Sequence, residues 1–276
     1  MVARPSALWL VGPDTRRFCN GMFTNNARDL GVGLGQRSAM LDDRGRVVGL
    51  MDLFCAAEDR FLVVPDGMSV DAFTERYSAF IVFDDVEIVP RPVATARIVL
   101  DGAPGWEIGG DERETSLRRP GETELWDVGP ALGIPEISTA DLELLRVAAG
   151  RVRWPEDVGP KRLPHELGLR DTALHFSKGC YVGQETVNRV DVMGEVKRAL
   201  FGLDIAGTGV PAGAAVHAAD GALLGELTSP VPNHASDGDQ TLALAVLRRP
   251  PAAPGADVEI RHGDQRWPGI VRDLPR

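Results

Sequence analysis

The chain of 276 residues carries 30 basic and 40 acidic side chains, which gives a formal net charge of -10. This charge excludes a general affinity for nucleic acid, because such binding depends on neutralising phosphates with Lys and Arg. Hydrophobic residues at 43% and charged residues at 25% are typical of globular proteins in water. No apolar run reaches the length of a membrane span and no secretory signal is evident. We therefore expect a cytoplasmic protein without membrane or direct nucleic-acid partners.

The three cysteines, Cys19, Cys55 and Cys180, are far apart and form no CxxC pair. An odd number of separated cysteines indicates neither a disulfide framework nor a structural zinc site. Three thiols are also fewer than the four that usually hold an iron–sulfur cluster. We expect no tightly bound metal, and we interpret Cys19 and Cys55 as buried apolar residues.

The first 90 residues show strand and helix patterns in turn. Ser69 is placed to cap a helix whose apolar residues recur at helical spacing as far as Phe80. Asp14 is a candidate cap for a short helix through Phe18. This order fits an α+β unit better than a βαβ repeat. Strands are predicted at 7–11, 60–64, 81–83 and 86–89.

From residue 91 to about residue 135 the pattern weakens. A strand at 97–100 precedes the polar stretch 109–124, which we expect to be a surface excursion. A helix is predicted over 139–149, because Ser138 or Thr139 can cap it and Gly150 can end it. The loop 154–164 contains three prolines and cannot be regular. Long irregular loops inside compact units are often functional.

After residue 196 short strand patterns alternate with turn signals, among them Asp220-Gly221 and Gly263-Asp264. Such a series predicts a small antiparallel β-barrel. We divide the chain into an α+β region, 1–195, whose two lobes meet near residue 90, and a C-terminal barrel, 196–276. The strands of the barrel are expected at 200–205, 214–218, 223–228, 241–247, 258–262 and 269–271.

The segment 176–189, FSKGCYVGQETVNR, combines a cysteine with two glycines and a helix-compatible run that starts near Gly183. A thiol near a helix N-terminus and beside Lys178 is favoured in its charged form by the helix dipole and by the ammonium. Lys178 is one of only three lysines among 30 basic residues, which indicates a role that needs a compact, titratable charge. Alternatively, Cys180 is a small buried apolar residue and the glycines only shape a turn.

The string KGCYVGQE, residues 178–185, resembles the signature of the YgfZ-type folate-binding proteins, a family similar in fold to the aminomethyltransferase of the glycine cleavage system. The resemblance implies an aminomethyltransferase-like α+β fold with three lobes around a central cavity. It also implies tetrahydrofolate or a one-carbon derivative as cofactor. Further stretches that resemble this family are 23–26, 41–47, 163–169, 193–200, 224–229 and 242–245.

The resemblance also implies roles for single residues of the signature. A folate tail bears carboxylates, which favour bidentate arginine, so arginines near the signature and in the first lobe are further candidates. Each of these arginines can equally be a solvated surface charge. The catalytic candidates are Cys180 and Lys178. The candidates for cofactor contacts are Asn25, Arg46, Tyr181, Gln184, Glu185, Arg189 and Arg198.

The chain departs from the aminomethyltransferases at acidic positions. Gly49 and Leu50 stand where those enzymes carry a pair of aspartates, and Ala148 stands where their Arg-x-Glu-Ala-Gly motif has its acid. An apolar side chain can neither act as a general base nor stabilise a developing cation. We therefore do not expect ordinary aminomethyl transfer.

Three functions stay open. The resemblance favours a tetrahydrofolate-binding accessory protein that supports the assembly or repair of iron–sulfur proteins, and thereby iron–sulfur-dependent tRNA modification. Its expected partners are folate and iron–sulfur proteins or their assembly factors. The alternatives are a one-carbon transferase or demethylase subunit that uses tetrahydrofolate, and a non-catalytic scaffold that binds a protein partner.

Overall fold

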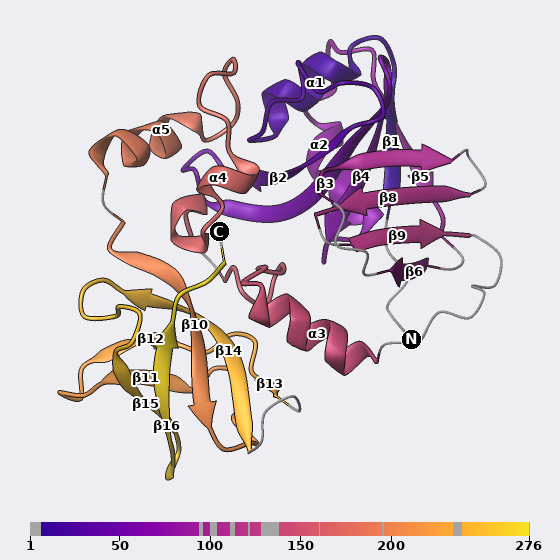
Figure 1. Ribbon diagram of the computed structural model, residues 1–276. Helices are drawn as coiled ribbons and strands as arrows, with labels where there is room; N and C mark the ends of the chain where they lie inside the picture. Colours follow the sequence, from indigo (N-terminus) through magenta and orange to yellow (C-terminus); the bar gives the residue numbers. More distant parts are fainter. Residues whose placement is uncertain are drawn as a thin grey trace. The chain divides into compact units, whose positions relative to one another are not determined.

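The computed structural model describes residues 7–93, 96–99, 104–110, 114–120, 122–127, 138–159, 161–194, 196–233 and 239–275. Contacts within the chain group it into two compact units (Figure 1). The first unit comprises Met1–Pro135 and Arg170–Asn188, and the second comprises Glu136–Leu169 and Arg189–Arg276. The division expected at 195–196 stays a prediction. The lobe division near residue 90 and the central cavity stay predictions.

The first unit is built on a five-stranded antiparallel sheet with the strand order β2-β3-β4-β1-β5. Leu8 and Leu10 belong to a core on one face of the sheet, and Trp9 belongs to a core on the other face, because successive side chains of a strand alternate. The strand predicted at 7–11 is confirmed, and the strand predicted at 60–64 is confirmed and extends to Asp66. The strands are β1 (Ala7–Val11), β2 (Gly35–Leu41), β3 (Val47–Ala57), β4 (Arg60–Asp66) and β5 (Glu87–Arg91).

Two helices pack on the face of the sheet that carries Leu8. They are α1 (Thr15–Met22) and α2 (Val70–Ser78), whose buried Phe18 and Phe73 join the same core. The helical spacing read from the sequence between residues 69 and 80 is thus confirmed, since it places the aromatic side chains on one face of α2.

The caps of these helices differ from each other. Ser69 Oγ accepts a hydrogen bond from Ala72 N at 3.1 Å, as predicted. Asp14 precedes α1, but its carboxylate accepts from Asp85 N at 2.9 Å and makes no capping bond to the helix. This bond holds the turn before β5.

The strand predicted at 81–83 is wrong, because the backbone bends there.

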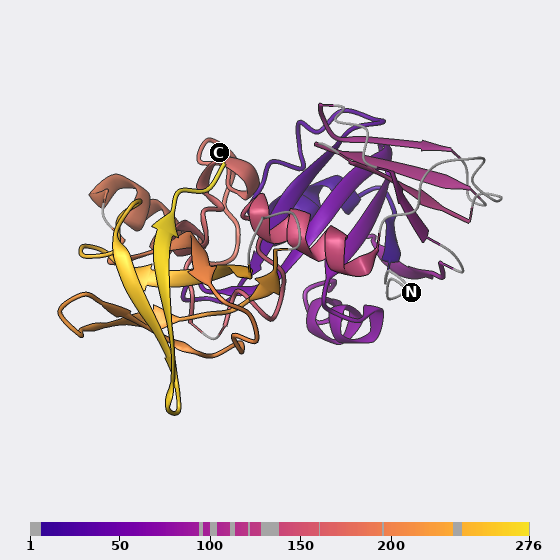
Figure 2. The ribbon, with the colours of Figure 1, turned by 60° about the horizontal axis from the view of Figure 1, so that its bottom comes forward.

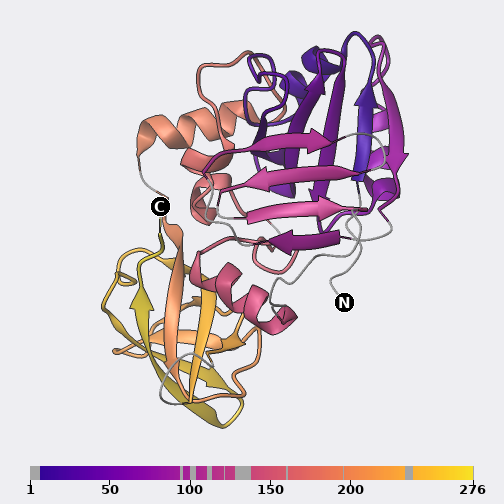
Figure 3. The ribbon, with the colours of Figure 1, turned by 45° about the vertical axis from the view of Figure 1, so that its right-hand side comes forward.

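A second antiparallel sheet of four strands, in the order β6-β9-β8-β7, also belongs to the first unit (Figure 3). The prediction of a surface excursion over 109–124 is therefore wrong. Leu117 and Trp126 from this sheet are buried against Trp9 and Phe54 of the first sheet, so a few large side chains hold otherwise polar strands. The strands are β6 (Ala96–Val99), β7 (Glu107–Gly110), β8 (Thr115–Arg119) and β9 (Glu122–Trp126).

The second unit contains a curled seven-stranded antiparallel sheet, in the order β12-β11-β15-β16-β10-β14-β13 (Figure 2). The hairpins predicted at Asp220-Gly221 and Gly263-Asp264 are confirmed as β11–β12 and β15–β16. A single bridge, Leu227–Ala245, joins the β12 end of the sheet to β14, so we describe a curled sheet rather than a closed barrel. The strands are β10 (Arg198–Ala206), β11 (Ala215–Ala218), β12 (Leu223–Glu226), β13 (Val231–Pro232), β14 (Gln240–Arg248), β15 (Asp257–His262) and β16 (Gln265–Arg272).

Two helical segments precede this sheet in the second unit: α3 (Thr139–Ala148) and the 3-10 helix η1 (Pro164–Leu167). The predicted helix over 139–149 is confirmed, with the Ser138 side chain accepting from Asp141 N. Val147 of α3 packs with buried residues of β13 and β14. No helix of the described residues is both long and apolar enough to cross a membrane.

Candidate functional site

The Cys180 loop, residues 174–183, connects α4 (Arg170–Ala173) to α5 (Gln184–Met193). The helix predicted to start near Gly183 is confirmed. Gly183 has a φ of 80° and lies against the β2–β3 turn, where an added Cβ would come within 2.6 Å of Asp42 O and 2.9 Å of Gly45 Cα. Only glycine permits this backbone approach. The two glycine backbones thus fix the loop against the turn that carries Arg46.

Lys178 is the buried anchor of the loop, with 6% of its surface exposed. Its ammonium donates hydrogen bonds to Phe23 O and, at 2.7 Å, to Asn25 O. The Nζ atom also lies 4.8 Å from the centroid of the Tyr181 ring. Lys178 therefore ties the Cys180 loop to the segment after α1.

Burial lowers the pKa of Lys178 to about 7, because the charged ammonium loses its hydration, and the positive charge of Arg28 acts in the same direction. A negative charge on Cys19 would raise this pKa. Lys178 can therefore exchange a proton near neutral pH, which an ordinary surface lysine cannot do.

The three thiols differ in their surroundings. Cys180 is exposed, whereas Cys19 and Cys55 are buried, as predicted for those two. The alternative that Cys180 is a buried apolar residue is wrong. Burial raises the pKa of the Cys19 thiol far above its ordinary value, and the Lys178 charge partly opposes this. The sequence pattern did not indicate that the Lys178 charge acts on the buried Cys19 thiol.

Two further residues of the signature shape the turn into α5. Tyr181 N donates to Gln184 Oε1 at 3.1 Å, and Gln184 N donates to Tyr181 O at 3.2 Å. The Tyr181 ring is buried, whereas Glu185 on the first turn of α5 is exposed. Tyr181 and Gln184 therefore maintain the loop, and Glu185 presents a carboxylate to solvent.

Asn25 and Arg46 are brought to the same region of the first unit as the Cys180 loop. The Asn25 side chain donates to Arg37 O of β2 at 2.9 Å and accepts from Asn26 N at 2.9 Å, so its polar atoms hold its own loop against β2. Its carbonyl is the one that accepts from Lys178. Arg46 is half-buried in the β2–β3 turn. Its backbone N donates to Asp42 Oδ1 at 2.8 Å, so its guanidinium is not needed for the turn.

Arg189 and Arg198 belong to the second unit, so their place beside the Cys180 loop stays a prediction. Arg189 lies on the exposed side of α5, and Arg198 begins β10. Among the described residues, no group of three or more His, Cys, Asp or Glu side chains could hold a metal ion.

Thr24 is an anchor that sequence reasoning missed. It is fully buried, its hydroxyl donates to Ala173 O at 2.6 Å, and the same oxygen accepts from Ala39 N at 2.8 Å. Its carbonyl accepts from His175 N at 3.1 Å. Thr24 thus joins β2 to the end of α4 and to the start of the Cys180 loop. A threonine between an aromatic residue and two asparagines was the only signal for it.

The acidic positions of the aminomethyltransferases are apolar in the structure as well. A Cβ on Gly49 would lie 2.4 Å from Met40 Cε, and Leu50 is fully buried. Asp52 is a nearby buried acid of β3 that the sequence analysis did not single out. Burial alone would raise the pKa of Asp52, but the guanidinium groups of Arg119 and Arg37 hold it below its ordinary value. An ionised carboxylate between two cations is a poor general base.

Known proteins resemble this chain in both sequence and fold. It is 22% identical to an aminomethyltransferase of Herpetosiphon aurantiacus over an alignment of 295 positions, which covers 94% of the chain and 81% of that protein. It is 36% identical over 74 residues to the tRNA-modifying protein YgfZ of Colwellia psychrerythraea, which is 26% of the chain and 23% of that protein. No protein-family model matches the chain.

The crystal structure of the glycine cleavage system aminomethyltransferase T from Bartonella henselae superimposes with a TM-score of 0.76 at 17% identity, over 98% of the chain and 83% of that protein. The fold is therefore that of the aminomethyltransferases. Together these likenesses support the interpretation of the chain as a YgfZ-like member of their superfamily.

Proposed function

We propose that the protein works in the cytoplasm as a tetrahydrofolate-binding accessory protein that supports the assembly or repair of iron–sulfur proteins, and that Cys180 is its reactive thiol. The main observation in favour is that Cys180 alone of the three thiols is exposed, in a loop that the buried Lys178 fastens to the chain. A thiol that handles sulfur or a cluster must be both accessible and held in place. Its partners are then iron–sulfur proteins or their assembly factors.

The residues around the Cys180 loop fit the chemistry of a folate. A pterin presents N–H donors, which the exposed Glu185 carboxylate can accept, and a folate tail presents carboxylates, which the half-buried Arg46 can pair with. A bound folate would supply or accept a one-carbon unit. Gly49, Leu50 and Ala148 leave no acid at the positions that aminomethyl transfer uses, which counts against the transferase alternative.

Folate binding is expected to depend on Arg46 and not on its neighbour. Arg46→Gln should weaken tetrahydrofolate binding by about one to two orders of magnitude, because a charge-assisted pair with a carboxylate contributes roughly 1.5 to 3 kcal/mol. Arg44→Gln is the matched control, since Arg44 is exposed in the same turn and the change in net charge is identical. Isothermal titration calorimetry measures the tetrahydrofolate affinity of both variants and of the wild type. Equal affinities of the two variants and the wild type would remove Arg46 from the site.

Cys180→Ser should leave the fold intact and abolish most of the support that the protein gives to iron–sulfur enzymes. The substitution removes the soft nucleophile but nearly keeps the side-chain volume, and the site is exposed. The measurement is the activity of an iron–sulfur enzyme in cells in which the variant replaces the wild-type protein. Ser177→Ala, an exposed neighbour in the loop, is the control.

Labelling of the thiols in the folded wild-type protein tests the reactivity of Cys180 directly. A thiol reagent should modify Cys180 about two orders of magnitude faster than Cys19 or Cys55, because the buried thiols react only after local opening of the fold. Equal labelling rates for all three thiols in the folded protein, or full iron–sulfur support by Cys180→Ser, would favour the scaffold alternative instead.

A further inference from the structure

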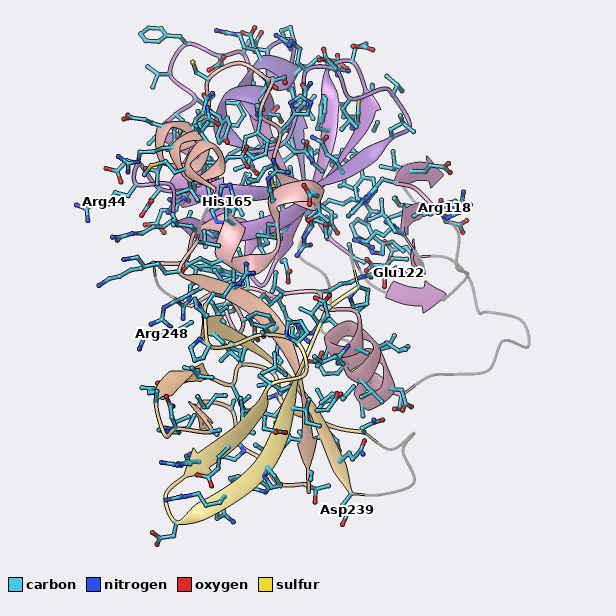
Figure 4. The ribbon with its side chains drawn as sticks, turned by 60° about the vertical axis from the view of Figure 1, so that its left-hand side comes forward. Arg44, Arg118, Glu122, His165, Asp239 and Arg248 are labelled. Carbon is cyan, nitrogen blue, oxygen red and sulfur yellow. The ribbon has the colours of Figure 1, made fainter. Side chains whose placement is uncertain are left out.

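Four cations gather at one end of the β10–β14 ladder in the second unit. Arg198 lies directly opposite Arg248 in the antiparallel register. One position further, Arg249 N donates to Lys197 O at 2.8 Å, so a second pair of basic residues lies next to the first, just beyond the ends of the two strands. Lys197, Arg248 and Arg249 are exposed and Arg198 is half-buried. Figure 4 shows Arg248 at the surface of the unit.

These four side chains form no ion pair and no hydrogen bond with any residue that the structure describes. Other arginines of the same unit do have carboxylate partners. Arg146 pairs with Glu143 and Asp157, and Arg272 pairs with Asp204 at 3.3 Å. In a chain with a net charge of -10, four cations thus lie together without a carboxylate partner among the described residues.

The arrangement opposes the stability of the sheet. Directly opposed residues of an antiparallel pair have Cβ atoms about 5 Å apart, and like charges at such positions are destabilising. An anion placed between Arg198 and Arg248 would relieve this repulsion, and each guanidinium can hold a carboxylate in a bidentate manner. Features that cost stability without a structural benefit are typical of binding sites.

We propose that Lys197, Arg198, Arg248 and Arg249 form a binding site for a short chain that carries several carboxylates. Two sources share this chemistry: the oligoglutamyl tail of a folate, which rests on the proposed function, and an acidic segment of a partner protein, which does not. A long polyphosphate is disfavoured, because the net charge of -10 repels it beyond the cluster. A short ligand interacts mainly with charges within a Debye length of about 8 Å.

The test uses the full-length protein and fluorescently labelled hexaglutamate, in γ-linked and α-linked forms, with binding measured by anisotropy at low and at physiological salt. Arg198→Gln with Arg248→Gln should weaken binding at least tenfold. The matched control is Arg261→Gln with Arg266→Gln, which removes two arginines from the β15–β16 hairpin of the same sheet, where both lie beside Glu259. We expect less than a twofold effect from this control.

The first double variant should unfold at the same temperature as the wild type or higher, because the repulsion between the two arginines is lost. A preference for the γ-linked form identifies a folate tail, and equal or tighter binding of the α-linked form identifies an acidic protein segment. The proposal is overturned if the double variant binds hexaglutamate as the wild type does, if the control weakens binding as much, or if an oligonucleotide of equal charge binds more tightly. Failure of tetrahydrofolate to bind would refute the proposed function but not this site, because hexaglutamate is measured without folate.

Discussion

Asp157→Ala should lower the free energy of unfolding by about 3 to 5 kcal/mol, the range found when a buried ion pair loses one partner. The Asp157 side chain is fully buried, and Arg146 Nη1 donates to its Oδ2 at 2.7 Å. Arg153 N donates to the same oxygen at 2.9 Å, while the hydroxyls of Thr228 and Ser229 donate to Oδ1 at 2.5 and 2.6 Å. Removal of the carboxylate leaves Arg153 N and the Ser229 hydroxyl without this acceptor and takes from Arg146 its fully buried partner, although Arg146 keeps Glu143 and Thr228 keeps Leu244 O.

Urea unfolding measures this change, and Glu156→Ala provides the control, because Glu156 is the exposed neighbour of Asp157 in the same loop. We expect Glu156→Ala to stay within about 0.5 kcal/mol of the wild type. Asp157→Asn keeps the volume and loses the charge, so its effect should be intermediate. A loss below about 1 kcal/mol for Asp157→Ala would mean that water replaces the carboxylate and that the loop is not locked.

The hydrogen bonds to the Asp157 carboxylate change the interpretation of the loop 154–164. Its prolines and its length suggested a functional excursion, but the carboxylate fastens it to α3 through Arg146 and to the chain between β12 and β13 through Thr228 and Ser229. Sequence reasoning could identify an irregular loop. It could not find the acceptor role of Asp157, because two of the four donors lie 71 and 72 residues away along the chain.

Elements with local signals were the ones that the sequence predicted well. Ser69 and Ser138 cap their helices through side-chain bonds to residues three positions later, and such patterns are visible in a short window. Of the four-stranded sheet only β6 was predicted, as the strand at 97–100, and the other three strands were missed because they are short and largely polar. Their burial depends on contacts of Leu117 and Trp126 with a sheet formed much earlier in the chain.

The candidate site also combines features that local sequence signals predicted with features that depend on distant parts of the chain. The signature indicated the loop, the start of α5 and the two glycines, because each leaves a mark in neighbouring residues. The anchoring of Lys178 left none, since its acceptors are backbone carbonyls 155 and 153 residues earlier, and a carbonyl has no sequence signature. The sequence therefore assigned Lys178 to the exposed thiol beside it, whereas the structure directs its ammonium into the protein.

Lys178→Met should change how the free energy of unfolding depends on pH more than it changes that free energy at any one pH. The pKa of Lys178 is about 7 in the folded protein and about 10.5 in the unfolded chain. Below pH 7 the residue is protonated in both states, and the full cost of burying the ammonium is present. Between pH 7 and pH 10.5 the unfolded chain binds more protons, so this group makes the wild type more stable as the pH rises.

In the wild type this increase in the free energy of unfolding should approach at most about 1.4 kcal/mol per pH unit. Lys178→Met should lack the increase. Urea unfolding at pH 6, 8 and 9.5 in both proteins isolates the group, because all other titrations are common to them. Lys161→Met is the control, since Lys161 is exposed and its substitution should leave the curve parallel to that of the wild type. A parallel curve for Lys178→Met as well would show that the ammonium keeps an ordinary pKa. Lys178 would then be a simple clamp on the Phe23 and Asn25 carbonyls, without a proton to exchange near neutral pH.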